Sequence, residues 1–154
     1  VAAARAEVLL VAPGVKVIRA GGYCDPVPEK ITPPRREGTI EFETNTGGFR
    51  FVAKGDRFPT RKGLGIGAAF LMEGYGPGRI MTVKIVPEYG EPTVYEPPVN
   101  SEGILEVGYV AAVGEALPPG RYMMSVLDGA KYLATYRFIL EAEAFDGLCI
   151  PFVS

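Results

Sequence analysis

Histidine is absent from this chain of 154 residues. Without it, the chain lacks the residue needed for Ser-His-Asp and Cys-His nucleophilic catalysis, for histidine general-base chemistry and for most catalytic zinc and haem sites. The chain also has no excess of positive charge, because it contains 16 Lys and Arg and 18 Asp and Glu, which gives a net charge of −2. The overall charge therefore gives no reason to expect nucleic acid as a partner.

Long apolar runs are also missing. A typical one, Gly65–Met72, is far shorter than the roughly 18 apolar residues of a membrane-spanning helix. The chain is 47% hydrophobic and 22% charged, which is typical of a globular domain rather than a disordered or collagen-like chain. We therefore predict no transmembrane segment and a single domain over residues 7–154.

Glycine and proline are abundant, at 20 and 14 residues, which disfavours long helices. Short segments rich in β-branched and aromatic residues lie between turn signals and predict strands. These segments are Val15–Tyr23, Gly38–Thr44, Phe49–Ala53, Gly65–Glu73, Arg79–Pro87, Ile104–Val113, Tyr122–Leu127 and Lys131–Leu140. Residues 8–14 are expected to form a loose arm, and the proline-rich residues 25–37 and 88–103 to form surface connections.

Two glycine signals sharpen this interpretation. Asp128-Gly129 predicts a tight hairpin that pairs the last two strands antiparallel, and Gly21-Gly22 predicts a bulge or a close backbone approach. About eight antiparallel strands without a credible amphipathic helix favour an all-β, immunoglobulin-like β-sandwich. A small open barrel is the alternative.

Three motifs resemble those of a bacterial family of exported immunoglobulin-like domains of unknown function. They are Gly21-Gly22-Tyr23, Pro59 to Gly63, and Pro119-Gly120-Arg121-Tyr122. The resemblance covers roughly residues 15–140 and implies the fold and an exported location, but no catalytic residue. The family often has Trp where this chain has Tyr122, and residues 88–103 match nothing in it. The Cys…Trp…Cys pattern of antibody domains is absent.

The two cysteines and the N-terminus bear on the compartment. Ala4 and Ala6 fit the small-residue pattern before a signal-peptide cleavage site, so residues 1–6 are either a signal-peptide remnant or a disordered Ala-rich start. Cys24 and Cys149 are expected to form a disulfide that stabilises the fold by roughly 4–5 kcal/mol. The alternative is two buried thiols. We predict a periplasmic or extracellular protein, or a cytoplasmic one if the thiols are free.

Candidate ligand-binding residues fall into a basic and an aromatic group. Lys54, Arg57, Arg61 and Lys62 lie beside a proline-containing turn, where they could attract an anionic glycan, a phosphate or an acidic surface, or simply form a solvated loop. Tyrosines in or next to predicted turns could contact sugars or proteins, or pack at the sandwich ends. These are Tyr75, Tyr89, Tyr95 and Tyr132.

Catalytic and cofactor patterns are weak. Glu41 with Glu43, and Glu141 with Glu143, share a strand face, which permits metal or acid-base chemistry but is also typical of a solvated sheet. Residues 63–68 fit the glycine pattern of dinucleotide sites, but no helix can follow it, so a glycine-rich core strand is favoured. We predict no catalytic residue, no metal and no cofactor.

The apolar segment Ile104–Val113 carries one charged residue and predicts either a central strand, which is favoured, or a sheet edge that accepts another strand. We interpret the protein as a non-catalytic binding or structural module of the bacterial envelope whose partner is an envelope protein or a glycan. The alternative is a carbohydrate-binding domain or a carboxylate-dependent hydrolase that uses Glu41, Glu43 and the loop tyrosines.

Overall fold

The computed structural model describes residues 7–24, 30–34, 36–44, 50–54, 57–60, 63–111 and 115–142. This part of the chain is all-β and contains no helix. Its twelve strands are β1 (Glu7–Val11), β2 (Val15–Cys24), β3 (Lys30–Thr32), β4 (Phe42–Thr44), β5 (Arg50–Lys54), β6 (Arg57–Pro59), β7 (Leu64–Met72), β8 (Thr82–Pro87), β9 (Thr93–Tyr95), β10 (Ile104–Tyr109), β11 (Gly120–Asp128) and β12 (Lys131–Glu141).

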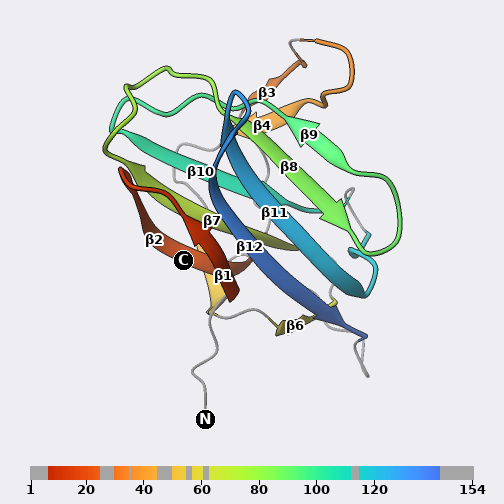
Figure 1. The fold of residues 1–154 in the computed structure, drawn as a ribbon. Helices are drawn as coiled ribbons and strands as arrows, with labels where there is room; N and C mark the ends of the chain where they lie inside the picture. Colours follow the sequence, from red (N-terminus) through yellow and green to blue (C-terminus); the bar gives the residue numbers. More distant parts are fainter. Residues whose placement is uncertain are drawn as a thin grey trace.

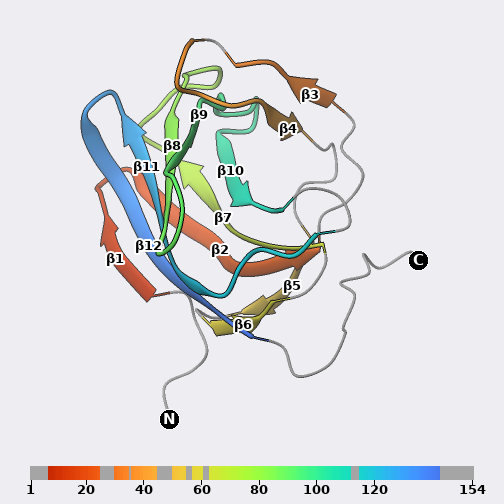
Figure 2. The same cartoon turned by 90° about the vertical axis from the view of Figure 1, so that its right-hand side faces the viewer.

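Two sheets form the body of the molecule (Figure 1). The first has the order β1-β12-β11-β8-β9, with β6 added beside β12, and the second has the order β10-β7-β2-β5. Figure 2 shows them as two layers, with the small β3–β4 pair at one end and β6 at the other. Because no ladder of the described residues joins the two sheets, the fold is a β-sandwich. The prediction of a β-sandwich is confirmed, and the described strands do not close into a barrel.

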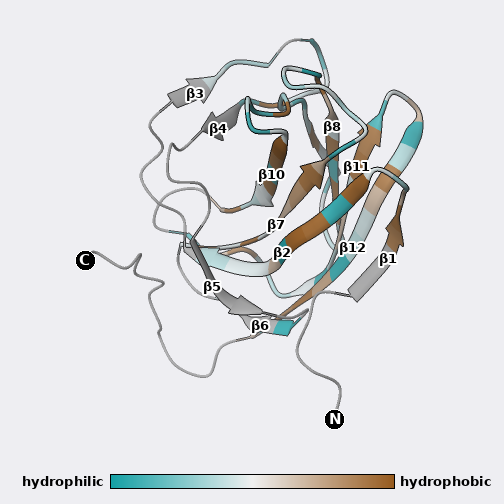
Figure 3. Cartoon of the chain, turned by 90° about the vertical axis from the view of Figure 1, so that its left-hand side faces the viewer, coloured by the Kyte–Doolittle hydropathy of each residue, from teal (hydrophilic) through white to brown (hydrophobic). Residues whose placement is uncertain are grey.

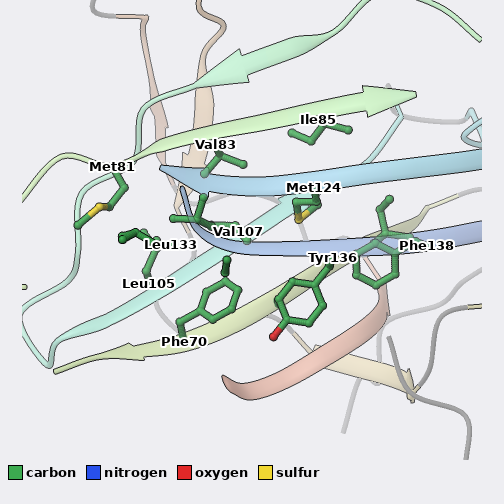
Figure 4. Close-up of a cluster of buried hydrophobic side chains, with 14 of the residues drawn as sticks. Phe70, Met81, Val83, Ile85, Leu105, Val107, Met124, Leu133, Tyr136 and Phe138 are labelled. Carbon is green, nitrogen blue, oxygen red and sulfur yellow. The ribbon is translucent and has the colours of Figure 1, made fainter. Parts of the chain in front are cut away.

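The core lies between the two sheets (Figure 4). Phe70 of β7 faces Tyr136 of β12 with ring centroids 5.7 Å apart, and Tyr136 stacks on Phe138 at 6.3 Å. Each large apolar side chain that is removed from water contributes roughly 1.5–3 kcal/mol, so this layer is the main source of stability. Other fully buried members include Ile66, Met72, Met81, Val83, Ile85, Leu105, Val107, Met124 and Leu133.

Most of the predicted strands are present with shifted ends, and all pairs in the two main sheets are antiparallel except β12 with β6. The predicted hairpin joins β11 and β12, with Asp128 opposite Lys131. Its two loop residues are Gly129, at φ +61°, and Ala130, so a glycine in first position makes this turn. The predicted bulge also occurs, because the β2–β5 register shifts between Gly22 and Tyr23.

Two predictions about local structure are wrong. Residues 8–14 are not a loose arm, since Glu7–Val11 forms β1 and pairs with β12. The strand predicted over Gly38–Thr44 is confined to β4, which begins at Phe42. Ile40, counted as a core-facing residue of that strand, is 44% exposed. Residues 38–41 therefore alternate in character without forming a strand, and the Ile40 side chain is not buried in the core.

The glycine pattern of residues 63–68 belongs to β7, as favoured from the sequence, and no helix follows it. A Cβ atom on Gly65 would lie 2.6 Å from the ring of Tyr23, and one on Gly67 would lie 2.5 Å from the carbonyl oxygen of Val107. Both glycines are therefore needed for packing: one admits the Tyr23 ring and the other the neighbouring strand β10.

Candidate functional site

The four tyrosines considered as ligand contacts do not come together. Tyr89 is 72% exposed and follows the end of β8, whereas Tyr75 is partly buried near the opposite end, with the Arg79 guanidinium 6.0 Å from its ring centroid. Tyr132 is 47% exposed beside the β11–β12 hairpin. Tyr95 is buried. Scattered over both ends and the interior, they do not form one aromatic binding surface.

Tyr95 has a structural role instead of being an exposed loop side chain. Its hydroxyl donates a hydrogen bond to the Gly108 carbonyl at 2.9 Å and accepts one from the Gly108 N–H at 2.8 Å. Burial raises the pKa of the phenol well above its ordinary value. Tyr95 therefore packs within the sandwich, as the alternative prediction states, because its hydroxyl is hydrogen-bonded to strand β10.

Of the basic group, the structure describes the side chain of Arg57 alone. It is exposed and lies 3.4 Å from Glu141, a surface ion pair of small energetic value. Lys54 ends β5, its side chain is outside the described residues, and Arg61 and Lys62 lie outside them entirely. A cationic cluster at this end of the sandwich therefore stays a prediction.

The carboxylate pairs give no catalytic geometry. Glu41 is exposed and Glu141 is paired with Arg57, while Glu143 and the side chain of Glu43 lie outside the described residues. Among the residues that are described, no three His, Cys, Asp or Glu side chains gather as metal ligands would. The hydrolase alternative consequently gains no support from the site geometry.

Strand β10 is an edge strand, so the favoured prediction that Ile104–Val113 is central is wrong. Within the described part of the chain, β10 pairs with β7 alone, and it ends at Tyr109. The backbone N–H and C=O groups on the outer side of β10 are nevertheless largely hydrogen-bonded. Beside the Tyr95 bonds to Gly108, the Ile104 N–H donates to Asn100 Oδ1 at 2.9 Å and the Asn100 N–H donates to the Ile104 carbonyl at 2.9 Å. These bonds protect the edge from pairing with another strand.

The opposite side of the sandwich, between β1 and β2, is organised differently. Strand β1 pairs with β12 on one side, and β2 pairs with β5 only from Gly21 onward. Residues 15–20 of β2 therefore have β7 on one side and no described strand on the other. Figure 3 shows β1 and β2 diverging from the turn that joins them. We call β1 and residues 15–20 of β2 the open side.

The open side exposes apolar side chains that the sequence analysis did not single out. Leu10 and Val11 of β1 are 41% and 37% exposed, and Val17 and Ile18 of β2 are 39% and 46% exposed. Val11 is paired with the buried Ala134 and Val17 with the buried Phe70. Since paired residues on adjacent strands share a sheet face, both valines face the interior from the rim of the sandwich.

Cations flank these apolar residues. Lys16 and Arg19 are exposed on β2, and Lys16 lies 3.0 Å from Glu73. The β2–β7 register shifts between Val17 and Arg19, which places a bulge at Ile18, and Lys16 and Arg19 pair with Leu71 and Ala69 on the outer face of the sheet, opposite Val17. The feature of the sequence that could have indicated this exposed surface is the segment Val15-Lys16-Val17-Ile18-Arg19, in which apolar residues fall on both faces of one strand.

Comparisons with known proteins leave the family resemblance untested, because no family model, curated protein or solved structure matches the chain. The described ranges hold no helix with the length and apolar character needed to cross a bilayer. Cys149 lies outside the described residues, as does the side chain of Cys24, so the disulfide stays a prediction.

Proposed function

We propose that this protein is a non-catalytic binding module of the bacterial envelope that takes up an extended segment of a partner protein at its open side. The observation that carries this proposal is a pair of strand edges, β1 and residues 15–20 of β2, that pair with no other strand of the described residues and have inward-facing valines at their rim. Such edges offer backbone hydrogen bonds to an added strand, and alternate side chains of that strand fill the apolar space between them.

The charges on the open side favour an acidic partner. Arg19 and Lys16 are exposed on the outer face of β2, and Glu73 pairs with Lys16. A strand with apolar residues on one face and Asp or Glu on the other would place its apolar side against Val11 and Val17. Its carboxylates would then lie near the two cations, which adds orientation and specificity.

The envelope location rests on the sequence. The resemblance to exported immunoglobulin-like domains and the two cysteines favour an oxidising compartment. Peptide mapping under non-reducing conditions tests this part separately: a Cys24–Cys149 cross-linked peptide supports it, and two free thiols contradict it.

A displayed library of peptides about ten residues long, selected against the oxidised chain, tests the binding function. The proposal predicts selected peptides that alternate apolar and other residues and carry Asp or Glu. Binding of one selected peptide is then measured by calorimetry to the parent chain, to Val17→Lys and to Val86→Lys. Val86 is the matched control because it is also 39% exposed but lies on β8.

Val17→Lys should weaken peptide binding at least about tenfold, or about 1.4 kcal/mol, whereas Val86→Lys should leave the affinity within about twofold of the parent. Equal losses in both variants would contradict the proposal, as would a selection that enriches no strand-like peptide. A glycan array that gives saturable binding unaffected by Val17→Lys would support the carbohydrate-binding alternative instead.

A further inference from the structure

Tyr136 is a buried residue whose hydroxyl group makes no hydrogen bond with the described residues. Its side chain is 1% exposed, and its hydroxyl has no hydrogen-bond partner among the residues that the structure describes. Two other buried tyrosines use their hydroxyls in hydrogen bonds: that of Tyr95 bonds Gly108, and that of Tyr122 donates to the Pro118 carbonyl. A buried hydroxyl without a partner costs free energy relative to a phenylalanine of the same shape.

The ring of Tyr136 lies directly behind the open side. Across the sheet, Tyr136 is paired with Val8 of β1, and across the interior its ring is 5.7 Å from that of Phe70. Phe70 is in turn paired with Val17 of β2. Figure 4 shows the hydroxyl pointing from β12 across the interior toward the opposite sheet. Tyr136 and Phe70 thus lie one strand in from β1 and β2, and the unpaired oxygen lies between the two sheets at this position.

We propose that Tyr136 determines which partner strand this side accepts, by hydrogen-bonding one small polar side chain, Ser, Thr or Asn, that the strand inserts between β1 and β2. The inference rests on the function proposed above and adds its specificity. A threonine on the inserted strand has the shape of valine but carries a hydroxyl. Burial of that hydroxyl is favourable only where it can form a hydrogen bond, for example with the Tyr136 hydroxyl.

Burial raises the pKa of Tyr136 to about 12, so the phenol is neutral at physiological pH. A neutral phenol can both donate and accept, which suits a hydroxyl or an amide. The proposal therefore favours these side chains over a carboxylate at the inward position, while the acidic residues of the strand stay near Lys16 and Arg19.

The test is a double-mutant cycle. Each inward position of one selected peptide is synthesised as Thr and as Val, and the affinity of each peptide is measured for the parent chain and for Tyr136→Phe. At one position the parent chain should prefer Thr to Val by about three- to tenfold, and Tyr136→Phe should abolish or reverse that preference. Tyr132→Phe is the matched control, because Tyr132 lies on the same strand but is 47% exposed.

The outcomes separate the two proposals. Peptides that bind in a Val17-dependent way but show the same Thr-to-Val ratio on the parent chain and on Tyr136→Phe would overturn this inference and leave the binding function standing. A crystal structure of the free chain in which a buried water joins the Tyr136 hydroxyl to the backbone would also overturn it. Failure of every strand-like peptide to bind would overturn both.

Discussion

The edge strand β10 and the open side, formed by β1 and residues 15–20 of β2, show how differently one molecule treats unpaired strand edges. At β10, the outward polar groups of Ile104 and Gly108 are bonded by Asn100 and Tyr95, and the strand buries Leu105 and Val107. At the open side, the Val15 N–H donates to the Ala12 carbonyl at 3.3 Å, no comparable bond to residues 16–20 is described, and the valines at the rim are more than one-third exposed. The first edge is closed by side chains, and the second is suited to accept a strand.

This contrast shows that apolar content alone does not mark a binding edge. Strand β10 is the more continuous apolar segment, yet its neighbours close it. Strand β2 carries Lys16 and Arg19 among its apolar residues and remains open. What separates the two edges is whether the chain supplies hydrogen-bond partners for the outer side of the strand.

The largest effect should come from placing a charge on each edge in turn. Val107→Asp buries an unpaired carboxylate at a fully buried site and should destabilise the fold by at least about 4 kcal/mol. Val17→Asp, at a site 39% exposed, should cost about 1 kcal/mol or less. Urea denaturation measures both free energies of unfolding, and similar losses would remove the distinction between the two edges.

Removing the tyrosine hydroxyl that closes β10 should have the next largest effect. Tyr95→Phe leaves both polar groups of Gly108 without this partner and should cost about 2–3 kcal/mol. The exposed Tyr132 provides the control, and Tyr132→Phe should change the free energy of unfolding by less than about 0.5 kcal/mol. A Tyr95→Phe variant as stable as the parent would mean that the hydroxyl does not secure the edge.

Alkaline pH should weaken the fold through the buried tyrosines. Burial raises the pKa of Tyr95 and brings those of Tyr122 and Tyr136 from the ordinary 10.0 to about 12. From about pH 10 to 12 the unfolded chain releases these protons while the folded chain keeps them, so stability falls as pH rises. The slope should approach about 1.4 kcal/mol per pH unit for each tyrosine.

Urea denaturation at a series of pH values measures this slope. Between pH 7 and pH 9 these phenols are neutral in both states, so their contribution should stay constant. Tyr95→Phe should make the slope above pH 10 shallower by the contribution of one tyrosine. An unchanged slope in this variant would show that Tyr95 is not a buried neutral phenol.

The smallest effect should come from the other bond that closes β10. Asn100 Oδ1 accepts hydrogen bonds from the N–H groups of Glu102 and Ile104, both at 2.9 Å. Asn100→Ala should therefore cost about 1 kcal/mol. Ser101→Ala, at an exposed neighbour, is the control and should be neutral. If Asn100→Ala lowers the free energy of unfolding much less than Tyr95→Phe does, Tyr95 is the main residue that closes β10. A larger loss in Asn100→Ala than in Tyr95→Phe contradicts that role.

The sequence predicted the features that depend on local chemistry. The hairpin at Gly129, the bulge after Gly22 and the β-sandwich itself follow from turn residues and short apolar runs. The features that were missed depend on neighbours distant in the chain. Alternation shows which face of Ile104–Tyr109 is buried, but not whether a strand lies on each side of it.

The site shows the same limit. Tyr95 lies between Pro92 and Pro97 and was expected in or next to a turn, whereas its two bonds to Gly108 exist only because β9 and β10 come together in the fold. Exposed residues of the open side, such as Val17, are of the same apolar types as the residues of an ordinary core strand. Their exposure follows from β5 pairing with β2 only from Gly21 onward, which no pattern within β2 encodes.

Amide hydrogen exchange, measured by NMR on the free chain and on the chain bound to a selected peptide, tests the contrast between the edges most directly. The account predicts slow exchange at Ile104 and Gly108 in both samples. At the outward amides of residues 16–20 it predicts fast exchange in the free chain and slow exchange in the complex. Slow exchange at residues 16–20 without peptide, or peptide-induced protection at β10 instead, would contradict the central claim that the open side receives the partner strand.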